Sequence, residues 1–230
     1  MQHTYGRKIT IDTQDLTVYS ATIGTCKEGY DVLKFLSLSY CIKCFLTFNY
    51  NYNVCMEIIL QPIETDLSND ILNLLYNSLL TEFHNVNVTI APTLKVDIQN
   101  FINKQKNQLQ SPILLHWILE KMKPTKEVKV LVICDMDAYS GELNFIFGEA
   151  HLRGRVAAIY LARLKPEFYD LEPNELVFYD RVTKEAIHEL GHSFGLFHCN
   201  NKKCVMHFSN SLYDTDFKNK IFCKNCKNNL

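Results

Sequence analysis

The segment His188–Cys199 reads HELGHSFGLFHC and decides how the chain around it is interpreted. His188 and His192 are four residues apart, so on an α-helix both side chains project from one face, one turn apart. That spacing lets both imidazole rings reach a single metal ion. Gly195 can adopt the left-handed backbone conformation that ends a helix, and the turn after it brings His198 back as a third nitrogen ligand. Three protein ligands and one open coordination position are typical of a catalytic zinc ion.

Glu189 directly follows the first histidine. On a helix it lies about a quarter-turn from His188, close enough to contact a metal-bound water without ligating the metal. A carboxylate in that position serves as a general base. The alternative is a surface helix that carries three histidines by chance. The composition of the chain makes the full motif a coincidence of roughly one in 100,000, so we favour the metal site.

Four cysteines follow the motif in two close pairs. Cys199 and Cys204 form C-x4-C, and Cys223 and Cys226 form C-x2-C. Four thiolates arranged in this way are what a closed tetrahedral zinc site needs. Met206 stands two residues after Cys204.

The run from the first histidine to the last cysteine resembles the archaemetzincin family, zinc peptidases of the metzincin clan. The family signature, HExxHxxGxxHC followed by C-x4-C-x-M and C-x2-C, is present in every letter. The resemblance implies an α/β fold, a metzincin-like zincin domain in which a mixed twisted sheet accompanies an active-site helix. It places this domain at residues 54–230, with an N-terminal subdomain over 54–197 and a C-terminal, zinc-bound subdomain over 198–230.

The resemblance also assigns roles to residues. It implies two zinc ions per chain, a catalytic ion held by the three histidines and a structural ion held by the four cysteines. Met206 becomes the Met-turn, an apolar floor that supports the metal without ligating it. In the metzincin clan an edge strand above the cleft pairs with extended substrate. By resemblance this role falls on Ala157, Ala158, Ile159, Tyr160 and Leu161.

Length and composition favour one domain with a sizeable core, because 47% of the 230 residues are hydrophobic. The net charge of −1 gives no electrostatic reason to expect nucleic acid or an acidic membrane as a partner. Nine cysteines, without a signal peptide at the N-terminus, indicate reduced thiols in a cytoplasmic, soluble protein. We also expect the protein to be a monomer. We expect the basic residues of the C-terminal segment to form a solvated face: Lys202, Lys203, Lys218, Lys220, Lys224 and Lys227.

Residues 1–53 form an extension of unknown structure that the resemblance does not cover. It contains Cys26, Cys41 and Cys44, with Cys55 just beyond it. The C-x-x-C at 41–44 allows a second metal knuckle, but a single pair is weak evidence. The other interpretation is an irregular extension with free or buried thiols.

The remaining chain alternates strand and helix patterns. We expect a strand over 54–60, bounded by Gln61-Pro62, and further strands over 86–90, 128–134 and 155–164. A Phe-x-Phe-Gly strand is expected within 143–150. Helices are expected from Ser68 or Asn69 to about Phe83, over 111–122, and over the metal-binding motif with Pro173 near its start. His116 and Trp117 are predicted to pack rather than to ligate. Asp135 and Asp137 favour a turn over a cation site.

These observations support zinc-dependent hydrolysis of peptide bonds, with Glu189 as general base and then general acid. The resemblance favours short peptides and aminopeptidase-like action. One alternative is a zinc-binding interaction protein with little hydrolytic activity, although the intact glutamate argues against a purely structural metal. Another is a zinc hydrolase that acts on a non-peptide amide.

Overall fold

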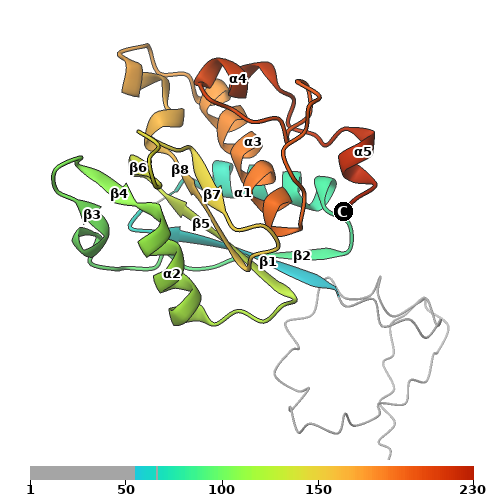
Figure 1. The fold of residues 1–230 in the computed structure, drawn as a ribbon, viewed down its shortest axis with the longest axis horizontal. Helices are drawn as coiled ribbons and strands as arrows, with labels where there is room; N and C mark the ends of the chain where they lie inside the picture. The colour runs from blue at the N-terminus through green and yellow to red at the C-terminus, as the bar shows by residue number, and fades with distance from the viewer. Residues whose placement is uncertain (1–54, 66) are drawn as a thin grey trace, which may run out of the picture. The chain divides into compact units, whose positions relative to one another are not determined.

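A central five-stranded sheet organises the protein, in the strand order β2-β1-β5-β8-β7 (Figure 1). The computed structural model describes residues 55–65 and 67–230, so Cys26, Cys41 and Cys44 lie outside the described residues, as does the expected extension. Four strands run parallel, and the short last strand runs antiparallel at the edge. The strands are β1 (Met56–Ile63), β2 (Val86–Ile90), β5 (Val128–Cys134), β7 (Gly148–Ala150) and β8 (Val156–Tyr160).

Helices cover both faces of this sheet, which explains why its inner strands are mostly apolar. In β5, Leu131 and Ile133 pack with α1 and α3, whereas Val130 and Val132 pack with α2. The mixed α/β architecture expected from the sequence is confirmed. The helices are α1 (Asn69–Glu82), α2 (Ser111–Met122), α3 (Glu175–Ser193), α4 (Leu212–Phe217) and α5 (Lys224–Lys227).

Short elements complete the fold. A second sheet has the strand order β3-β4-β6 and lies beside α2. Arg163 donates to both carboxylate oxygens of Asp137 in the loop after β5, and Lys165 pairs with Asp135. These acidic residues therefore fix the loop through ion pairs. The short elements are β3 (Ile102–Asn103), β4 (Gln108–Gln110), β6 (Ala138–Tyr139), η3 (Ile98–Phe101), η4 (Ala162–Leu164) and η5 (Pro166–Tyr169).

Side-chain caps set where the helices begin. The hydroxyl of Ser68 accepts a hydrogen bond from the Ile71 backbone at 3.4 Å, as predicted for α1. Asn174 caps α3 by accepting from the Val177 backbone at 3.1 Å. Pro173 lies directly before this cap, near the start of the helix as predicted.

Strand β1 runs past the Gln61-Pro62 pair that was expected to end it. Its pairing with β2 stops at Leu60, and beyond that residue β1 continues along β5 as far as Ile63. Proline is tolerated there because β1 no longer needs a backbone N–H on both sides.

The predicted edge strand is an interior strand. Ala157, Ala158, Ile159 and Tyr160 belong to β8, which is paired with β5 on one side and β7 on the other. Leu161 follows the strand and is buried. Because both sides of β8 are used within the sheet, it has no free main-chain groups for a substrate. The prediction for these five residues is wrong, and β7 is the edge.

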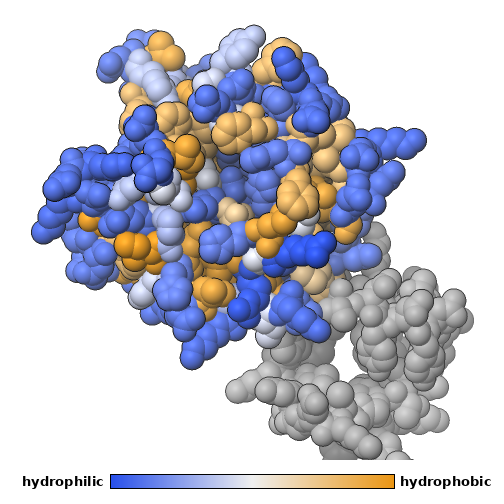
Figure 2. All heavy atoms as spheres, in the orientation of Figure 1, coloured by the Kyte–Doolittle hydropathy of each residue, from blue (hydrophilic) through white to orange (hydrophobic). Residues whose placement is uncertain are grey.

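Polar residues dominate the outline of the face shown in Figure 2, and apolar residues gather toward its middle. Among the six lysines expected to be solvated, Lys218 is buried at 2% exposure because its ammonium group pairs with Glu185. Lys227 is half-buried, and the other four are exposed. Across the described ranges, no helix combines the length and apolarity needed to cross a membrane.

The packing of α1 on the sheet predicts a large stability difference between two leucines. Leu75 of α1 is fully buried, whereas Leu176 of α3 is 83% exposed. Leu75→Ala should lower the free energy of unfolding by about 2–5 kcal/mol, because it leaves a cavity in the core. The matched control Leu176→Ala should change it by less than about 0.5 kcal/mol. Urea unfolding at a fixed zinc concentration, followed by circular dichroism, measures both; equal effects would contradict the packing described.

Candidate active site

The three histidines of the motif meet at one point. The Nε2 atom of His192 lies 3.1 Å from that of His188 and 3.2 Å from that of His198. Tetrahedral zinc with Zn–N bonds of about 2.0–2.1 Å requires nitrogen separations of about 3.3 Å. The observed spacing is close to this, so the three side chains form a set that can hold one metal ion.

Backbone carbonyl groups orient two of these rings. The Nδ1 atom of His188 is 2.8 Å from the carbonyl oxygen of Val205, and that of His192 is 2.7 Å from the oxygen of Leu196. A carbonyl oxygen can only accept, so each Nδ1 carries the proton and each Nε2 presents a lone pair to the metal position. Burial lowers the pKa of all three histidines, most strongly for His188. The cluster is therefore neutral, the form that binds metal.

The chain reversal that delivers His198 depends on Gly195. This glycine has a φ of +104°, and its backbone N–H donates to the carbonyl of His192 at 2.9 Å. Residues with a side chain resist that conformation, so the helix ends here as the sequence predicts. His198 then packs against Phe208 in a tilted arrangement, with ring centroids 5.0 Å apart.

Glu189 is buried beside the histidines and has no hydrogen-bond or ion-pair partner among the described residues. Burial raises its pKa well above the usual range, and the negative charge of Glu185 adds to this. A cation held by the histidines would oppose the shift. Gly148 makes room for this side chain, because a Cβ atom at residue 148 would lie 2.5 Å from Cγ of Glu189.

Met206 lies beneath the metal-binding helix. It is fully buried, and a Cβ atom at Gly191 would lie 2.4 Å from its sulfur. The turn around Met206 also carries the carbonyl of Val205, which holds His188. The position of Met206 is consistent with the supporting role that the resemblance implied.

The four cysteines form a second cluster. The sulfur atoms of Cys199 and Cys223 are 3.8 Å apart, and those of Cys204 and Cys226 are 3.7 Å apart. These distances exclude disulfides and match the edge of a tetrahedron with Zn–S bonds of about 2.3 Å. All four sulfur atoms lie within 4.8 Å of one another, so the set can hold a metal ion.

The thiols of this cluster differ in how readily they ionise. The backbone N–H of Cys226 lowers the pKa of Cys223 to about 7, whereas burial raises the pKa of Cys204 and of Cys226. Four thiolates at this spacing repel one another, so a bound cation is needed to ionise the whole set.

A cavity of about 370 Å³ opens beside the histidines. Edge strand β7 and the segment before it line one side, α3 lines another, and Phe208, Ser209 and Asn210 line a third. The volume falls within the range of small-ligand pockets.

Glu185 and Lys218 were not predicted from the sequence as residues of the site. Glu185 lines the cavity, and one of its carboxylate oxygens lies 3.1 Å from the ammonium group of Lys218. The helical spacing of four residues between Glu185 and Glu189 indicated a shared helix face, but no sequence pattern linked Glu185 to a lysine 33 residues away.

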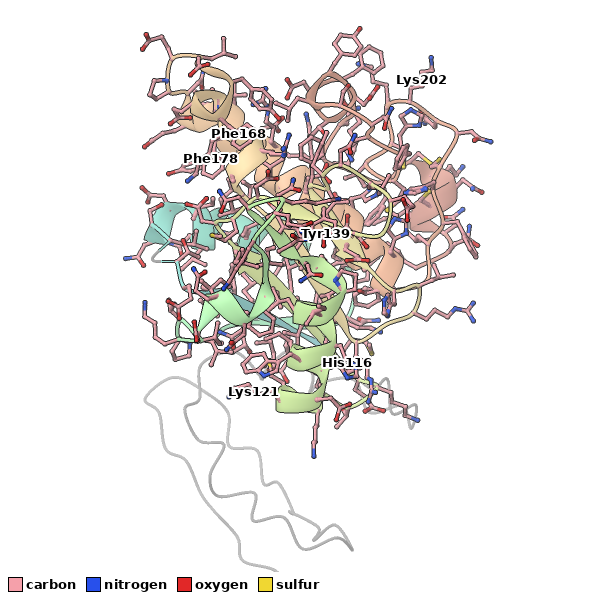
Figure 3. All side chains as sticks on the ribbon, turned by 60° about the vertical axis from the view of Figure 1, so that its left-hand side comes forward. His116, Lys121, Tyr139, Phe168, Phe178 and Lys202 are labelled. Atoms are coloured by element: carbon pink, nitrogen blue, oxygen red, sulfur yellow. The ribbon has the colours of Figure 1, made fainter. Side chains whose placement is uncertain are left out.

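His116 was expected to pack, but it is exposed on α2, whereas Trp117 packs against Phe101 at 5.5 Å between ring centroids. Figure 3 shows His116 and Lys121 at one end of the molecule, far from Lys202 of the cysteine-bearing segment. His116 therefore belongs to neither metal cluster.

Comparisons with known proteins agree with this geometry. The family model described as Peptidase family M54 matches residues 80–230. The chain belongs to peptidase family M54. An archaemetzincin from Methanocaldococcus jannaschii is 43% identical over 175 residues, which cover 76% of this chain and 93% of the relative.

Solved structures show the same relationship. An archaemetzincin from Methanopyrus kandleri has a TM-score of 0.67 at 31% identity, and the match covers 78% of this chain and 96% of that structure's chain. An archaemetzincin from Archaeoglobus fulgidus, complexed with malonate, has a TM-score of 0.62 at 34% identity, covering 76% and 100%. A zinc-dependent peptidase from Methanocorpusculum labreanum has a TM-score of 0.62 at 25% identity, covering 75% and 98%. The resemblance to archaemetzincins is confirmed, and the chain is a metallopeptidase.

The contact between Gly148 and Glu189 predicts that a single methyl group impairs this metallopeptidase. Gly148→Ala would place Cβ 2.5 Å from Cγ of Glu189, so the glutamate must move away from the metal position. We expect peptide hydrolysis to fall about 100-fold, because small misplacements of a reacting group are costly.

The fold should survive this substitution, which circular dichroism and thermal unfolding test. Gly141→Ala is a control without a clash, since a Cβ atom there would meet no atom within 4 Å. Its φ of +55° makes this substitution slightly destabilising, but hydrolysis should stay unchanged. Unchanged hydrolysis by a folded Gly148→Ala variant would contradict the packing role of this glycine.

Proposed function

We propose that this metallopeptidase cleaves peptide bonds with Glu189 as general base and then general acid. The observation that carries the proposal is the buried, unpartnered carboxylate of Glu189 next to three converging histidine nitrogens. A metal site with a purely structural role has no use for such a base.

The residues would share the work as follows. Zinc bound at His188, His192 and His198 would lower the pKa of a bound water and polarise the scissile carbonyl. Glu189 accepts the proton of that water and later delivers it to the departing amine. The carbonyl oxygens of Val205 and Leu196 keep two of the imidazole rings in the tautomer that this arrangement needs.

We infer that an extended substrate pairs with β7, in place of the interior strand expected from the sequence. Within the part of the chain that the structure describes, β7 pairs with β8 on one side only, and it lines the cavity from Gly148 to Ala150. An unpaired strand edge is a common way to hold a peptide main chain. The limited volume of the cavity supports short peptides as substrates, and with them aminopeptidase-like action.

A second zinc ion in the four-cysteine cluster would support the first. His198 and Cys199 are neighbours, so the two metal sites share a peptide bond. The backbone N–H of Cys199 donates to the carbonyl of Met206 at 2.9 Å, and His207 Nδ1 donates to the carbonyl of Cys199 at 2.9 Å. The cluster thus fixes the end of the chain reversal and the turn beneath the histidines. Cytoplasmic location and a monomeric state stay predictions.

The general-base role predicts the behaviour of Glu189→Gln. The variant should retain its metal, because Glu189 does not ligate it, and should lose about 10²–10⁴-fold in kcat. Mass spectrometry of a diverse peptide mixture, together with metal analysis of each protein, measures both effects. The positions of the new termini distinguish amino-terminal trimming from internal cleavage.

Glu175→Gln is the matched control, because Glu175 lies exposed in the first turn of the same helix. It should cleave like the wild type. Full activity in Glu189→Gln would refute the general-base role. The absence of cleavage products with the zinc-loaded wild type would favour the alternative of a zinc-binding interaction protein.

Because the two metal sites share a peptide bond, we predict that a substitution in the cysteine cluster also lowers the zinc affinity of the histidine cluster. Cys226→Ser should abolish zinc binding at the cluster and weaken zinc binding at the histidines roughly 10–100-fold, because their support is lost. Competition with a chelator measures the two affinities. The control Cys55→Ser removes a thiol outside the cluster and should leave both unchanged. Unaltered affinity at the histidines in Cys226→Ser would refute the coupling.

A further inference from the structure

Glu185 is a buried carboxylate that the proposed mechanism leaves without a task. It lies on α3 one turn before Glu189, and its side chain is 4% exposed. It nevertheless lines the cavity beside the histidines. A buried carboxylate with access to a substrate cavity needs a chemical reason, because its desolvation is costly.

The known partners of Glu185 use one of its two oxygens. Lys218 lies 3.1 Å from Oε1, and the hydroxyl of Thr215 donates to the same oxygen at 3.4 Å. Oε2 accepts no hydrogen bond in the described part of the chain. The lysine therefore orients the carboxylate through one oxygen and leaves the other available to a ligand in the cavity.

The cavity wall is acidic, although the ammonium group of Lys218 offsets part of the charge of Glu185. Its lining includes four glutamates and neither lysine nor arginine. Glu149 is turned toward the opposite face of the sheet, where it accepts a hydrogen bond from Ser140 at 2.7 Å. The second oxygen of Glu149 is buried without a hydrogen-bond partner on that opposite face. Glu142 is exposed, and Glu189 serves the reaction. Glu185 is thus the buried carboxylate on the α3 side of the cavity whose Oε2 accepts no hydrogen bond from the described residues.

We propose that Glu185 binds a positively charged ammonium group of the substrate and so determines which peptides are cleaved. Three residues separate Glu185 from His188, about one helical turn or 5 Å along α3. The ammonium group therefore belongs to a residue close to the scissile bond. The ammonium donates to Oε2, a charge-assisted hydrogen bond in a site that water reaches poorly.

The contact with Lys218 makes this recognition specific. With Oε1 held, the carboxylate cannot swing toward the metal position and compete with the substrate carbonyl. The cavity would then discriminate against a peptide that offers only an apolar group, because Oε2 would stay buried and unpaired.

This inference rests on the proposed peptidase activity. An ammonium group has two sources in a peptide, the free amino terminus and a lysine side chain. A peptide series separates them: lysine or norleucine at each position beside the scissile bond, each with a free or an acetylated amino terminus. Norleucine has an unbranched alkyl chain without the ammonium group.

The variant to test is the double substitution Glu185→Gln and Lys218→Met. Glu185→Gln alone would leave the ammonium of Lys218 buried without its partner, which endangers folding. The double variant removes both charges and keeps similar side-chain volumes. Glu142→Gln is the matched control, because it removes one negative charge from the exposed part of the cavity wall.

For the wild type, we compare lysine with norleucine and a free with an acetylated amino terminus. In at least one of these two comparisons, kcat/KM should be roughly tenfold higher for the peptide that carries the ammonium group. The double variant should lose this preference, and Glu142→Gln should keep most of it. Loss of the lysine preference assigns the side chain as the ligand, and loss of the free-terminus preference assigns the α-amino group. Either result supports the inference.

Two outcomes would overturn it. One is a wild type that cleaves charged and uncharged peptides equally, which leaves the peptidase activity intact. The other is a preference that persists in the folded double variant. Failure to cleave any peptide would instead refute the proposed activity and the inference together.

Discussion

The structure depends on holding three imidazole nitrogens at a separation that only a shared cation makes favourable. His192 Nε2 lies 3.1 and 3.2 Å from its two neighbours, and all three rings are neutral because burial lowers their pKa values. Without a proton between them, the facing lone pairs repel. The rings stay in place because the carbonyls of Val205 and Leu196 fix two of them from behind.

The supports of this site come from segments that precede and follow α3 in the sequence. Val205 belongs to the turn that carries Met206, and this turn is bonded to Cys199 of the four-cysteine cluster. On the other side, β7 presents Gly148 so that Glu189 can approach the sheet edge closely. A helix with the same residues but without these neighbours would present histidines in no fixed arrangement.

Local patterns were enough to predict most of the regular elements. The apolar run VKVLVIC gave β5 with its observed bounds, and Ser68 marked the start of α1. Proline positions were less informative: Pro62 was expected to end a strand that continues to Ile63. Propensity describes a residue alone, whereas the cost of a missing N–H depends on which neighbouring strand needs it.

The sequence by itself determined the metal chemistry, because the spacing of the histidines and the glutamate on one helix face follows from helical geometry. It could not determine that the strand 156–160 lies inside the sheet or that Lys218 is buried against Glu185. Strand order and ion pairs between distant residues depend on how elements pack in three dimensions. Only the tertiary structure therefore decided which strand forms the edge of the sheet and which carboxylates line the cavity.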